Sequence, residues 1–281
     1  LGLAVKTPTV PFHTWLPPAH TDASSVGSAV LAGVLLKMGT YGFVRIAMPM
    51  LPEAWRSWAW VIIVVGIVSG LYGALVALAQ HDLKRMIAFT SVNHMGYIVL
   101  AVGAAGLVAG DSAQARGIAV TGAVTQMVSH GLITGALFLL AGTLHDRAGT
   151  YEMSRFGGLA GPAPRLAGLF AVGAFASLGL PALSGFIAEF QIFTGAIAVA
   201  PVTAVALLGI LITAALFLRA LQRVFTGELR GTSVGFVDLR PREVWSTGIL
   251  LGLSLLIGVY PGPLLALIEP AASAVVTLLG R

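Results

Sequence analysis

The sequence contains no cysteine and few charged side chains. The lack of cysteine excludes disulfide bonds and cysteine-ligated iron–sulfur clusters on this chain, so any redox chemistry needs another cofactor or another subunit. Charged residues make up 10% of the 281 residues, whereas a typical soluble domain has about 25%. A phosphate-binding glycine loop, a dinucleotide fingerprint and a nucleophile–base constellation are also missing. These absences argue against a soluble enzyme, and we expect no cofactor and no metal on this chain.

Apolar residues dominate the sequence, with 57% hydrophobic residues and a mean hydropathy of +0.92. A membrane-spanning helix needs about 20 apolar residues, and runs of this kind lie at Val26–Met48, Trp58–Ala79, Met86–Gly110, Gly117–Leu144, Leu166–Val199, Val202–Leu218 and Val244–Leu267. We therefore predict an all-α, multi-pass membrane protein, a bundle of about seven to eight helices in the lipid bilayer. The sequence begins inside a further apolar stretch without a signal-peptide pattern, so we interpret it as the later, C-terminal part of a longer chain.

The basic residues lie between the apolar runs and test this layout. The formal charge is +5, but no basic patch is interleaved with aromatics, which argues against a nucleic-acid partner. If the spans alternate, ten basic residues fall on one side and four on the other. The positive-inside rule then places the larger group in the cytoplasm. This group comprises Lys84, Arg85, Arg147, Arg155, Arg165, Arg219, Arg223, Arg230, Arg240 and Arg242, and the smaller one Arg45, Arg56, Arg116 and Arg281.

Two prolines divide the apolar stretch from Leu166 to Leu218, which holds a single charged residue, Glu189, and is too long for one crossing of the membrane. Pro201 is expected to mark a turn between two spans, and Pro181 to break one helix into two halves. Broken helices at membrane depth survive only where protein or water satisfies the freed backbone groups, so they mark functional cavities. Glu189 follows Pro181 by eight residues, which is typical of an ion-binding or proton-relay carboxylate. The alternative is a structural partner for a buried lysine.

Three further ionisable residues fall inside predicted spans. Lys37 lies near the middle of its span, where a lysine costs roughly 2.5–3.5 kcal/mol and its side chain is too short to reach the interface. Gly33 and Tyr41 share its helix face. Histidine as a residue type titrates near neutral pH, and both His94 and His130 carry polar neighbours at helical spacing, Thr90 and Ser91 for the first and Gln126 and Thr134 for the second. Hydrogen-bonded packing, or a haem held between the two histidines, is the alternative to a relay.

Lys6 precedes Pro8 and is a candidate for a second helix break, although its depth is open because the preceding residues are not seen. His13 and His20 lie in the proline-rich connection that follows. These two histidines have no third ligand nearby for a metal. We therefore interpret them as packing and hydrogen-bonding groups at the membrane interface.

Several segments resemble the M-subunit family of bacterial NADH:quinone oxidoreductase (respiratory complex I), within the antiporter-like superfamily. The resemblance covers nearly the whole chain, and the string PFHTWLP favours this family over others of the superfamily. It is carried by residues 6–21 (KTPTVPFHTWLPPAHT), 31–42 (LAGVLLKMGTYG), 82–96 (DLKRMIAFTSVNHMG), 129–131 (SHG), 157–159 (GGL) and 180–190 (LPALSGFIAEF).

The resemblance implies an antiporter-like fold of two inverted five-helix repeats, each with a discontinuous helix. It matches Lys6 with the lysine of the first broken helix, Lys37 with the lysine that links two half-channels, His94 and His130 with the central histidines, and Glu189 with the carboxylate of the second broken helix. The family also pairs the first lysine with a glutamate on an earlier helix, which is not part of this sequence, so that glutamate is not assigned. The sequence departs from the family at Pro18, at residues 22–25 and in a longer connection over residues 103–116.

We expect three parts on this basis: residues 1–48 end the first repeat, residues 49–224 form the second repeat of about five spans, and residues 225–281 form a cytoplasmic loop and the final span. The implied function is that of a proton-translocating membrane-arm subunit of NADH:quinone oxidoreductase, a translocase of the respiratory chain in the bacterial inner (plasma) membrane. Burial disfavours the charged forms of lysine and glutamate alike, so such groups in contact can exchange protons. Other membrane-arm subunits of complex I would be its partners, and flavin, iron–sulfur clusters and quinone would lie on partner subunits.

Two alternatives remain open from the sequence. The first is a cation/proton antiporter, or a membrane-bound hydrogenase subunit, of the same superfamily. The second is a structural membrane subunit whose buried charges only fix helix register.

Overall fold

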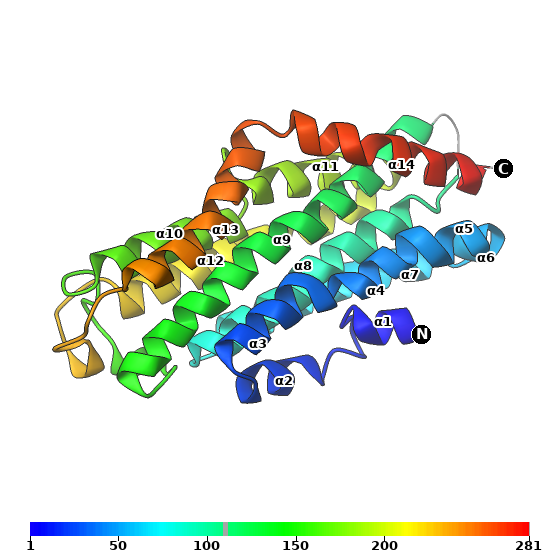
Figure 1. Cartoon of the computed structure of the whole chain (residues 1–281). Coiled ribbons are helices and arrows are strands. Elements are labelled where there is room, and N and C mark those ends of the chain that lie inside the picture. The colour runs from blue at the N-terminus through cyan, green and yellow to red at the C-terminus, as the bar shows by residue number, and fades with distance from the viewer. Residues whose placement is uncertain (109–111, 281) are drawn as a thin grey trace.

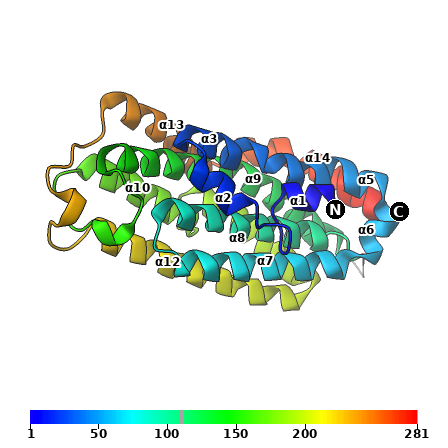
Figure 2. The same ribbon diagram turned by 90° about the horizontal axis from the view of Figure 1, so that it is seen from below.

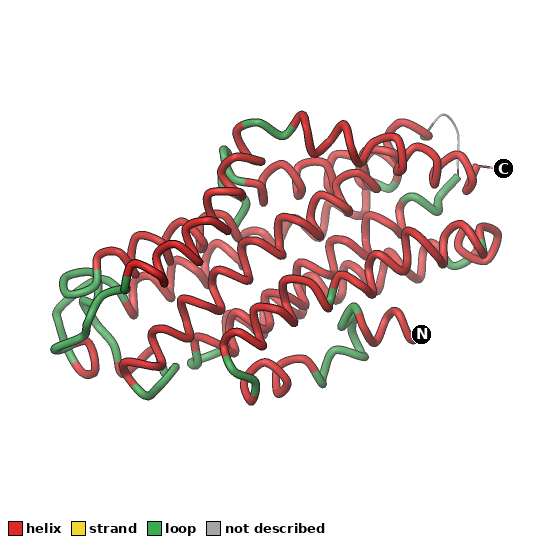
Figure 3. Tube along the Cα trace, viewed as in Figure 1, coloured by secondary structure: helices red, strands yellow, loops and turns green. Residues whose placement is uncertain are grey.

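Helices account for nearly all of the regular structure in the computed structural model, which describes residues 1–108 and 112–280 (Figures 1 and 3). The α-helices are α1 (Gly2–Lys6), α2 (Leu16–Asp22), α3 (Ser25–Val30), α4 (Lys37–Gly42), α5 (Met48–Met50), α6 (Pro52–Ser57), α7 (Ala59–Ala79), α8 (Leu83–Ala104), α9 (Ala113–Ala148), α10 (Pro164–Ser177), α11 (Ser184–Val199), α12 (Leu208–Val224), α13 (Pro241–Val259) and α14 (Gly262–Gly280). Two π-helical segments, η1 (Leu31–Leu35) and η2 (Phe43–Ala47), join α3, α4 and α5 into one rod, and three 3₁₀ segments are η3 (Met153–Arg155), η4 (Pro201–Leu207) and η5 (Gly231–Ser233).

Seven helical segments in the described chain are long and apolar enough to cross a membrane. They begin with the rod Ser25–Met50 and continue with α7, α8, α9, the segment Pro201–Val224, α13 and α14. The shorter apolar helices α10 and α11 divide the predicted run Leu166–Val199 between them. The prediction of a multi-pass, all-α membrane bundle is confirmed.

The last predicted span is wrong in one respect, because the run Val244–Leu267 is divided between two helices. Helix α13 ends at Val259, and α14 begins at Gly262. The intervening Tyr260 has φ −131° and ψ 72°, outside the α-helical region that a following proline disfavours, and Pro261 follows it. The predicted run to Gly110 also ends early, because α8 stops at Ala104; residues 109 and 110 lie outside the described chain.

Helix α8 forms the centre of the bundle, since every one of its residues except Arg85 is buried. Its contact with α7 is close because glycines face the neighbouring backbone. A Cβ atom on Gly96 would lie 2.4 Å from the amide nitrogen of Gly70, and one on Gly73 would lie 2.5 Å from the amide nitrogen of Asn93. Small residues of this kind permit tight helix pairs within a membrane. The long helix α9 crosses α8 on its other side (Figure 2).

The loops that carry the larger basic group gather at one end of the bundle, at the left in Figure 1. Hydrogen bonds link them across the chain: the amide of Leu83 donates to the carbonyl of Tyr151 over 2.9 Å, and the amide of Gly158 to that of Thr226 over 3.0 Å. The short helices α5 and α6 and the two chain ends lie toward the opposite end. The predicted alternation of the loops therefore agrees with the fold.

Candidate functional site

The chain breaks between α10 and α11, as Pro181 predicts. Residues 178–183 leave the helical path, and two of them, Gly179 and Ala182, both have φ +77°. Glycine tolerates this left-handed conformation, whereas it is strained for alanine. A Cβ atom on Gly185 would lie 2.1 Å from the carbonyl oxygen of Ala176, so the two half-helices approach each other closely. The break therefore brings backbone groups of both halves to one place in the bundle.

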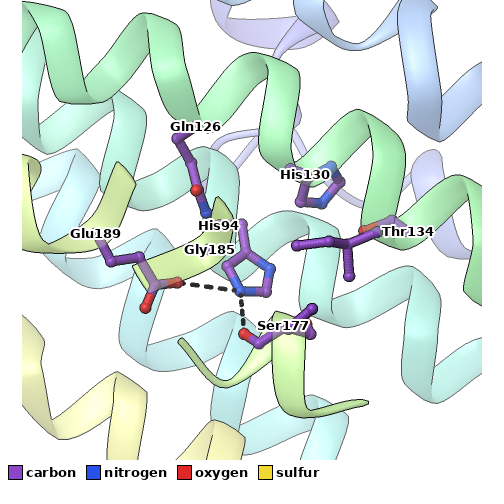
Figure 4. A pocket seen from close by; sticks show the side chains of 9 residues that line it. His94, Gln126, His130, Thr134, Ser177, Gly185 and Glu189 are labelled. Carbon is purple, nitrogen blue, oxygen red and sulfur yellow. Dashed lines mark hydrogen bonds and ion pairs between the residues drawn. The ribbon is translucent and has the colours of Figure 1, made fainter. Parts of the chain in front are cut away.

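Glu189 lies in the second half of this broken helix and is only 4% exposed. Its carboxylate turns back toward the break, where a Cβ atom on Gly179 would lie 2.7 Å from Oε2. The other oxygen, Oε1, lies 3.5 Å from Nε2 of His94 on α8 (Figure 4). A carboxylate without bulk water thus faces an imidazole that can carry a compensating charge.

His94 contacts both halves of the broken helix. Its Nε2 atom lies 3.1 Å from the carbonyl oxygen of Ser177, the last residue of α10, as well as close to Glu189 (Figure 4). Because a carbonyl only accepts hydrogen bonds, this geometry assigns the proton to Nε2. The ring is therefore oriented by one half-helix and aimed at the carboxylate of the other.

His130 on α9 continues the row on the other side of His94. The two imidazole rings lie 5.3 Å apart between centroids at an angle of 67°. The Nδ1 atom of His130 lies 2.7 Å from Nζ of Lys37, and Nζ also donates to the carbonyl of Ala32. Two positive charges at 2.7 Å would repel by about 6 kcal/mol at an effective dielectric constant of about 20, so Lys37 and His130 share one charge at a time.

A small cavity lies beside the two histidines. Its volume is about 10 Å³, roughly the space that one water molecule needs. Gln126 and Thr134 line it together with His130, as their helical spacing predicts (Figure 4). Within the described chain, Nδ1 of His94, Nε2 of His130 and Oε1 of Gln126 are buried and have no protein hydrogen-bond partner. One water molecule bridging these atoms would satisfy them.

Each end of the row borders an apolar groove. Lys37 is 9% exposed and borders a groove of about 760 Å³ between the rod and α9, which Gly33 and Tyr41 also line as predicted. Glu189 borders a second groove of about 590 Å³ lined by Phe186 and Phe190. The row Lys37–His130–His94–Glu189, called the buried row below, thus extends between two grooves in the bundle.

The structure joins four of the five predicted site residues and leaves the fifth apart. Lys6 ends α1 at a second break in the chain, over residues 7–15, as its proline neighbour predicts. In the part of the chain that is described, its ammonium group has no hydrogen bond or ion pair. Helix α1 nevertheless packs against α4, where a Cβ atom on Gly39 would lie 3.0 Å from the carbonyl oxygen of Leu3.

His13 and His20 lie outside the buried row. His13 packs edge-on against Tyr72 with 5.0 Å between ring centroids, and His20 stacks on Phe138 at 4.5 Å. Both are packing positions, as predicted, but the predicted hydrogen bonds are not formed by either ring nitrogen of His20 or by Nδ1 of His13 within the described chain. Among residues 1–108 and 112–280, no three His, Asp or Glu side chains come together as metal ligands.

Sequence reasoning missed a row of three buried hydroxyl groups beside the break. Ser184, the first residue of α11, lies 2.8 Å from Ser129 Oγ on α9 and 2.7 Å from Ser254 Oγ on α13. All three residues are at most 1% exposed. Ser129 directly precedes His130, and Ser184 follows the break, so the positions of these two serines in the sequence pointed to the site. Ser254 lies far along the chain from every other motif. The carbonyl of Ser177 was missed because a backbone group leaves no signature in the residue type.

The family model of the NADH:quinone oxidoreductase/Mrp antiporter transmembrane family matches residues 1–216 of this chain. A similar protein is NADH-quinone oxidoreductase subunit M of Rickettsia prowazekii, 41% identical over 267 residues, which are 94% of this chain and 52% of the relative. F(420)H(2) dehydrogenase subunit M of Methanosarcina mazei is 42% identical over 280 residues, or 99% of this chain and 54% of the relative. The chain therefore spans about half the length of the curated relatives it matches.

Two solved structures share the fold. The chain aligns with a chain of respiratory complex I from Thermus thermophilus with a TM-score of 0.89 and 37% identity, covering 99% of this chain and 57% of the other. A chain of the Mrp complex from Dietzia sp. gives a TM-score of 0.86 at 23% identity, covering 99% of this chain and 60% of the other, which supports the fold alone. The predicted antiporter-like fold is confirmed by these two matches.

Proposed function

The chain belongs to the NADH:quinone oxidoreductase/Mrp antiporter transmembrane family, and on that premise we propose that it moves protons within a membrane-arm subunit of NADH:quinone oxidoreductase. The observation that carries this proposal is the buried row itself. Lys37, His130, His94 and Glu189 follow one another through the bundle without bulk water, with contacts of 2.7 Å at one end and 3.5 Å at the other. Intramembrane ionisable residues are costly and mark ion or proton pathways.

A proton passes along the row because each step changes the charge beside the next group. When Glu189 is ionised, its carboxylate favours a protonated His94, 3.5 Å away. Charged Lys37 passes a proton to Nδ1 of His130 through their direct contact and becomes neutral, and the resulting imidazolium releases its Nε2 proton through a water molecule in the cavity to Nδ1 of His94. The transfer is reversible, so its direction depends on which end of the row receives or loses a proton first.

Lys6 is the proposed group at the break between α1 and α2. It connects to the row only if water or further parts of a longer chain join it to Lys37. The three-part division at residues 48 and 224 is likewise proposed, with the second part holding His94, His130 and Glu189. Redox chemistry is assigned to partner subunits that carry flavin, iron–sulfur clusters and quinone, and the enzyme would reside in the bacterial inner membrane beside other membrane-arm subunits.

The variant Lys37→Met in the assembled complex tests this function. Methionine retains most of the side-chain volume but cannot hold a proton. We expect fewer protons pumped per quinone reduced, measured with a pH-sensitive dye in sealed vesicles, with the complex still assembled. Arg45→Met is the matched control, because Arg45 lies two turns further along the same rod, is exposed and has no place in the row.

An unchanged proton stoichiometry in assembled Lys37→Met complexes would refute the relay and favour a structural membrane subunit. Sodium-dependent proton antiport by the chain in vesicles that lack the redox partners would instead favour the cation/proton antiporter. The match to a chain of an Mrp complex shows only a common fold at 23% identity, so the redox-linked function remains the proposal.

A further inference from the structure

We propose that residues 238–258, called the clamp segment below, hold the two halves of the broken helix in place and thereby set the position of Glu189 against His94. The clamp segment comprises the end of the loop at the basic end and nearly all of α13. It lies beyond the residues that match the family model, which end at 216. The inference rests on the proposed role of Glu189 in proton transfer. It adds a positioning element to the buried row.

The first contact of the clamp segment is with the beginning of α10. The carboxylate of Asp238 accepts hydrogen bonds from the amides of Arg165 and Leu166, at 3.0 and 3.1 Å. These amides belong to the first turn of α10, where no helical carbonyl is available to them. A carboxylate at a helix N-terminus also interacts favourably with the helix dipole. Asp238 therefore caps α10 from a distance of more than 70 residues along the chain.

The second contact is with the beginning of α11. Ser254 on α13 lies 2.7 Å from the hydroxyl of Ser184, the first residue of α11, and Ser184 in turn lies 2.8 Å from Ser129 on α9. The row of hydroxyl groups thus joins three helices at the break. Buried hydroxyl groups without partners are costly, so each serine constrains the other two.

The third contact is one helical turn beyond Ser254. A Cβ atom on Gly258 would lie 2.3 Å from the carbonyl oxygen of Ala182 and 2.4 Å from Cα of Leu183. The backbone of α13 therefore presses directly against the non-helical residues of the break. Only a residue without a side chain fits between these two backbones.

The clamp segment is itself anchored at the basic end of the bundle. Arg147 at the end of α9 donates to Oε2 of Glu243 over 2.6 Å and to the carbonyl of Asp238 over 3.2 Å. The amide of Arg240 also donates to Glu243, over 2.7 Å. The clamp segment thus connects the basic-end loops to the middle of the bundle (Figure 1).

The consequence concerns the two partners of His94. One partner, the carbonyl of Ser177, ends α10, and the other, Glu189, lies on α11. The clamp segment holds the beginning of each of these half-helices, so it controls their separation. A displacement of about 1 Å between groups that exchange a proton can change a rate by up to about a hundredfold.

The test uses the assembled complex and a reading that does not depend on pumping. A hydrophobic carbodiimide labels protonated buried carboxyls, and mass spectrometry gives the labelling rate at Glu189. We expect Gly258→Ala and Ser254→Ala each to change this rate by about tenfold and to lower proton pumping. Ser254→Thr, which keeps a hydroxyl group, should restore both. Matched controls are Gly252→Ala, where a Cβ atom meets nothing within 4 Å, and Ser246→Ala, whose hydroxyl donates only to a carbonyl within α13.

Labelling and pumping at wild-type rates in assembled Ser254→Ala and Gly258→Ala complexes would overturn the proposal. If Gly258→Ala fails to assemble, the comparison of Ser254→Ala with Ser254→Thr decides alone. A loss of pumping without a change in labelling would also refute it, because α13 would then act elsewhere than on Glu189. Normal pumping by Glu189→Gln would refute the proposed function instead, and the labelling rate would still test the clamp segment.

Discussion

The contact between Glu189 and His94 leads to a graded prediction for two substitutions of the carboxylate. Glu189→Gln keeps the shape of the side chain and removes its charge. Glu189→Asp keeps the charge and withdraws it by one methylene group. A relay that depends on charge therefore predicts a fixed order of proton-transfer rates, in which wild type is fastest, Asp follows and Gln is slowest.

The magnitudes follow from the distance between the two side chains. Opposite charges 3.5 Å apart attract by about 5 kcal/mol at an effective dielectric constant of about 20, and side-chain exposures of 3% and 6% leave little screening by solvent. Withdrawal by one C–C bond moves the carboxylate to about 5 Å, where the attraction is about 3 kcal/mol. Since about 1.4 kcal/mol corresponds to a factor of ten, Glu189→Asp should slow proton transfer roughly tenfold and Glu189→Gln roughly a thousandfold.

The assay is proton pumping driven by quinone reduction in vesicles, measured beside the electron-transfer rate of the same preparation. The control is Glu269→Gln, because Glu269 is an exposed carboxylate on α14 outside the buried row. Equal losses for Glu189→Asp and Glu189→Gln would refute a charge-dependent relay and indicate that the position matters for packing. Wild-type pumping by both variants would remove Glu189 from the pathway altogether.

Three further predictions concern stability. Gly96→Ala should destabilise the α7–α8 pair by about 1–3 kcal/mol, because its Cβ atom would lie 2.4 Å from the backbone of α7. Gly117→Ala is the control and should have no such effect, because its Cβ atom would meet nothing within 4 Å. Thermal unfolding of the purified complex measures both variants, and equal unfolding midpoints would contradict the packing argument. Neutralising Arg147 and Glu243 singly and together should give a coupling energy of about 1 kcal/mol, since their 2.6 Å ion pair is partly exposed; additive losses would show that the pair does not interact. Ser69→Ala should speed hydrogen exchange at residues 7–15, because the amide of Val10 loses its 2.9 Å acceptor, and unchanged exchange would show that another group replaces it.

The spans and the break were predictable because they follow from single-residue properties. Apolar length predicts a crossing in any bundle, and Pro181 lacks the amide hydrogen that a continuous helix needs. The burial of Lys37 was predictable for the same reason, since its distance from both ends of the span is set by sequence alone. Side-chain faces at helical spacing also predicted that Gln126 and Thr134 lie with His130.

Pairings across helices were not predictable from this sequence without the resemblance to a family. The contact of Lys37 with His130 joins residues 93 positions apart, and the rotation of each helix about its axis decides it. The cap that Asp238 provides for α10 was invisible because capping motifs are sought within a few residues of a helix start. The separation of α13 from α14 was missed because hydropathy continues unchanged across Pro261, although the proline itself gave a signal.

Local departures from α-helical geometry coincide with the two ends of the buried row. Lys37 begins α4 two residues after the π-helical segment η1, and its ammonium group donates to the carbonyl of Ala32 within that segment. Glu189 lies beside the break, against Gly179. Carbonyl groups released from regular helical hydrogen bonding can accept from a charged donor without competition. By contrast, His94 and His130 lie in uninterrupted helices, where contacts from other helices orient their rings. At the Lys37 end the irregular backbone therefore supplies an acceptor for the ammonium group, while the regular helices fix the spacing of the two histidines.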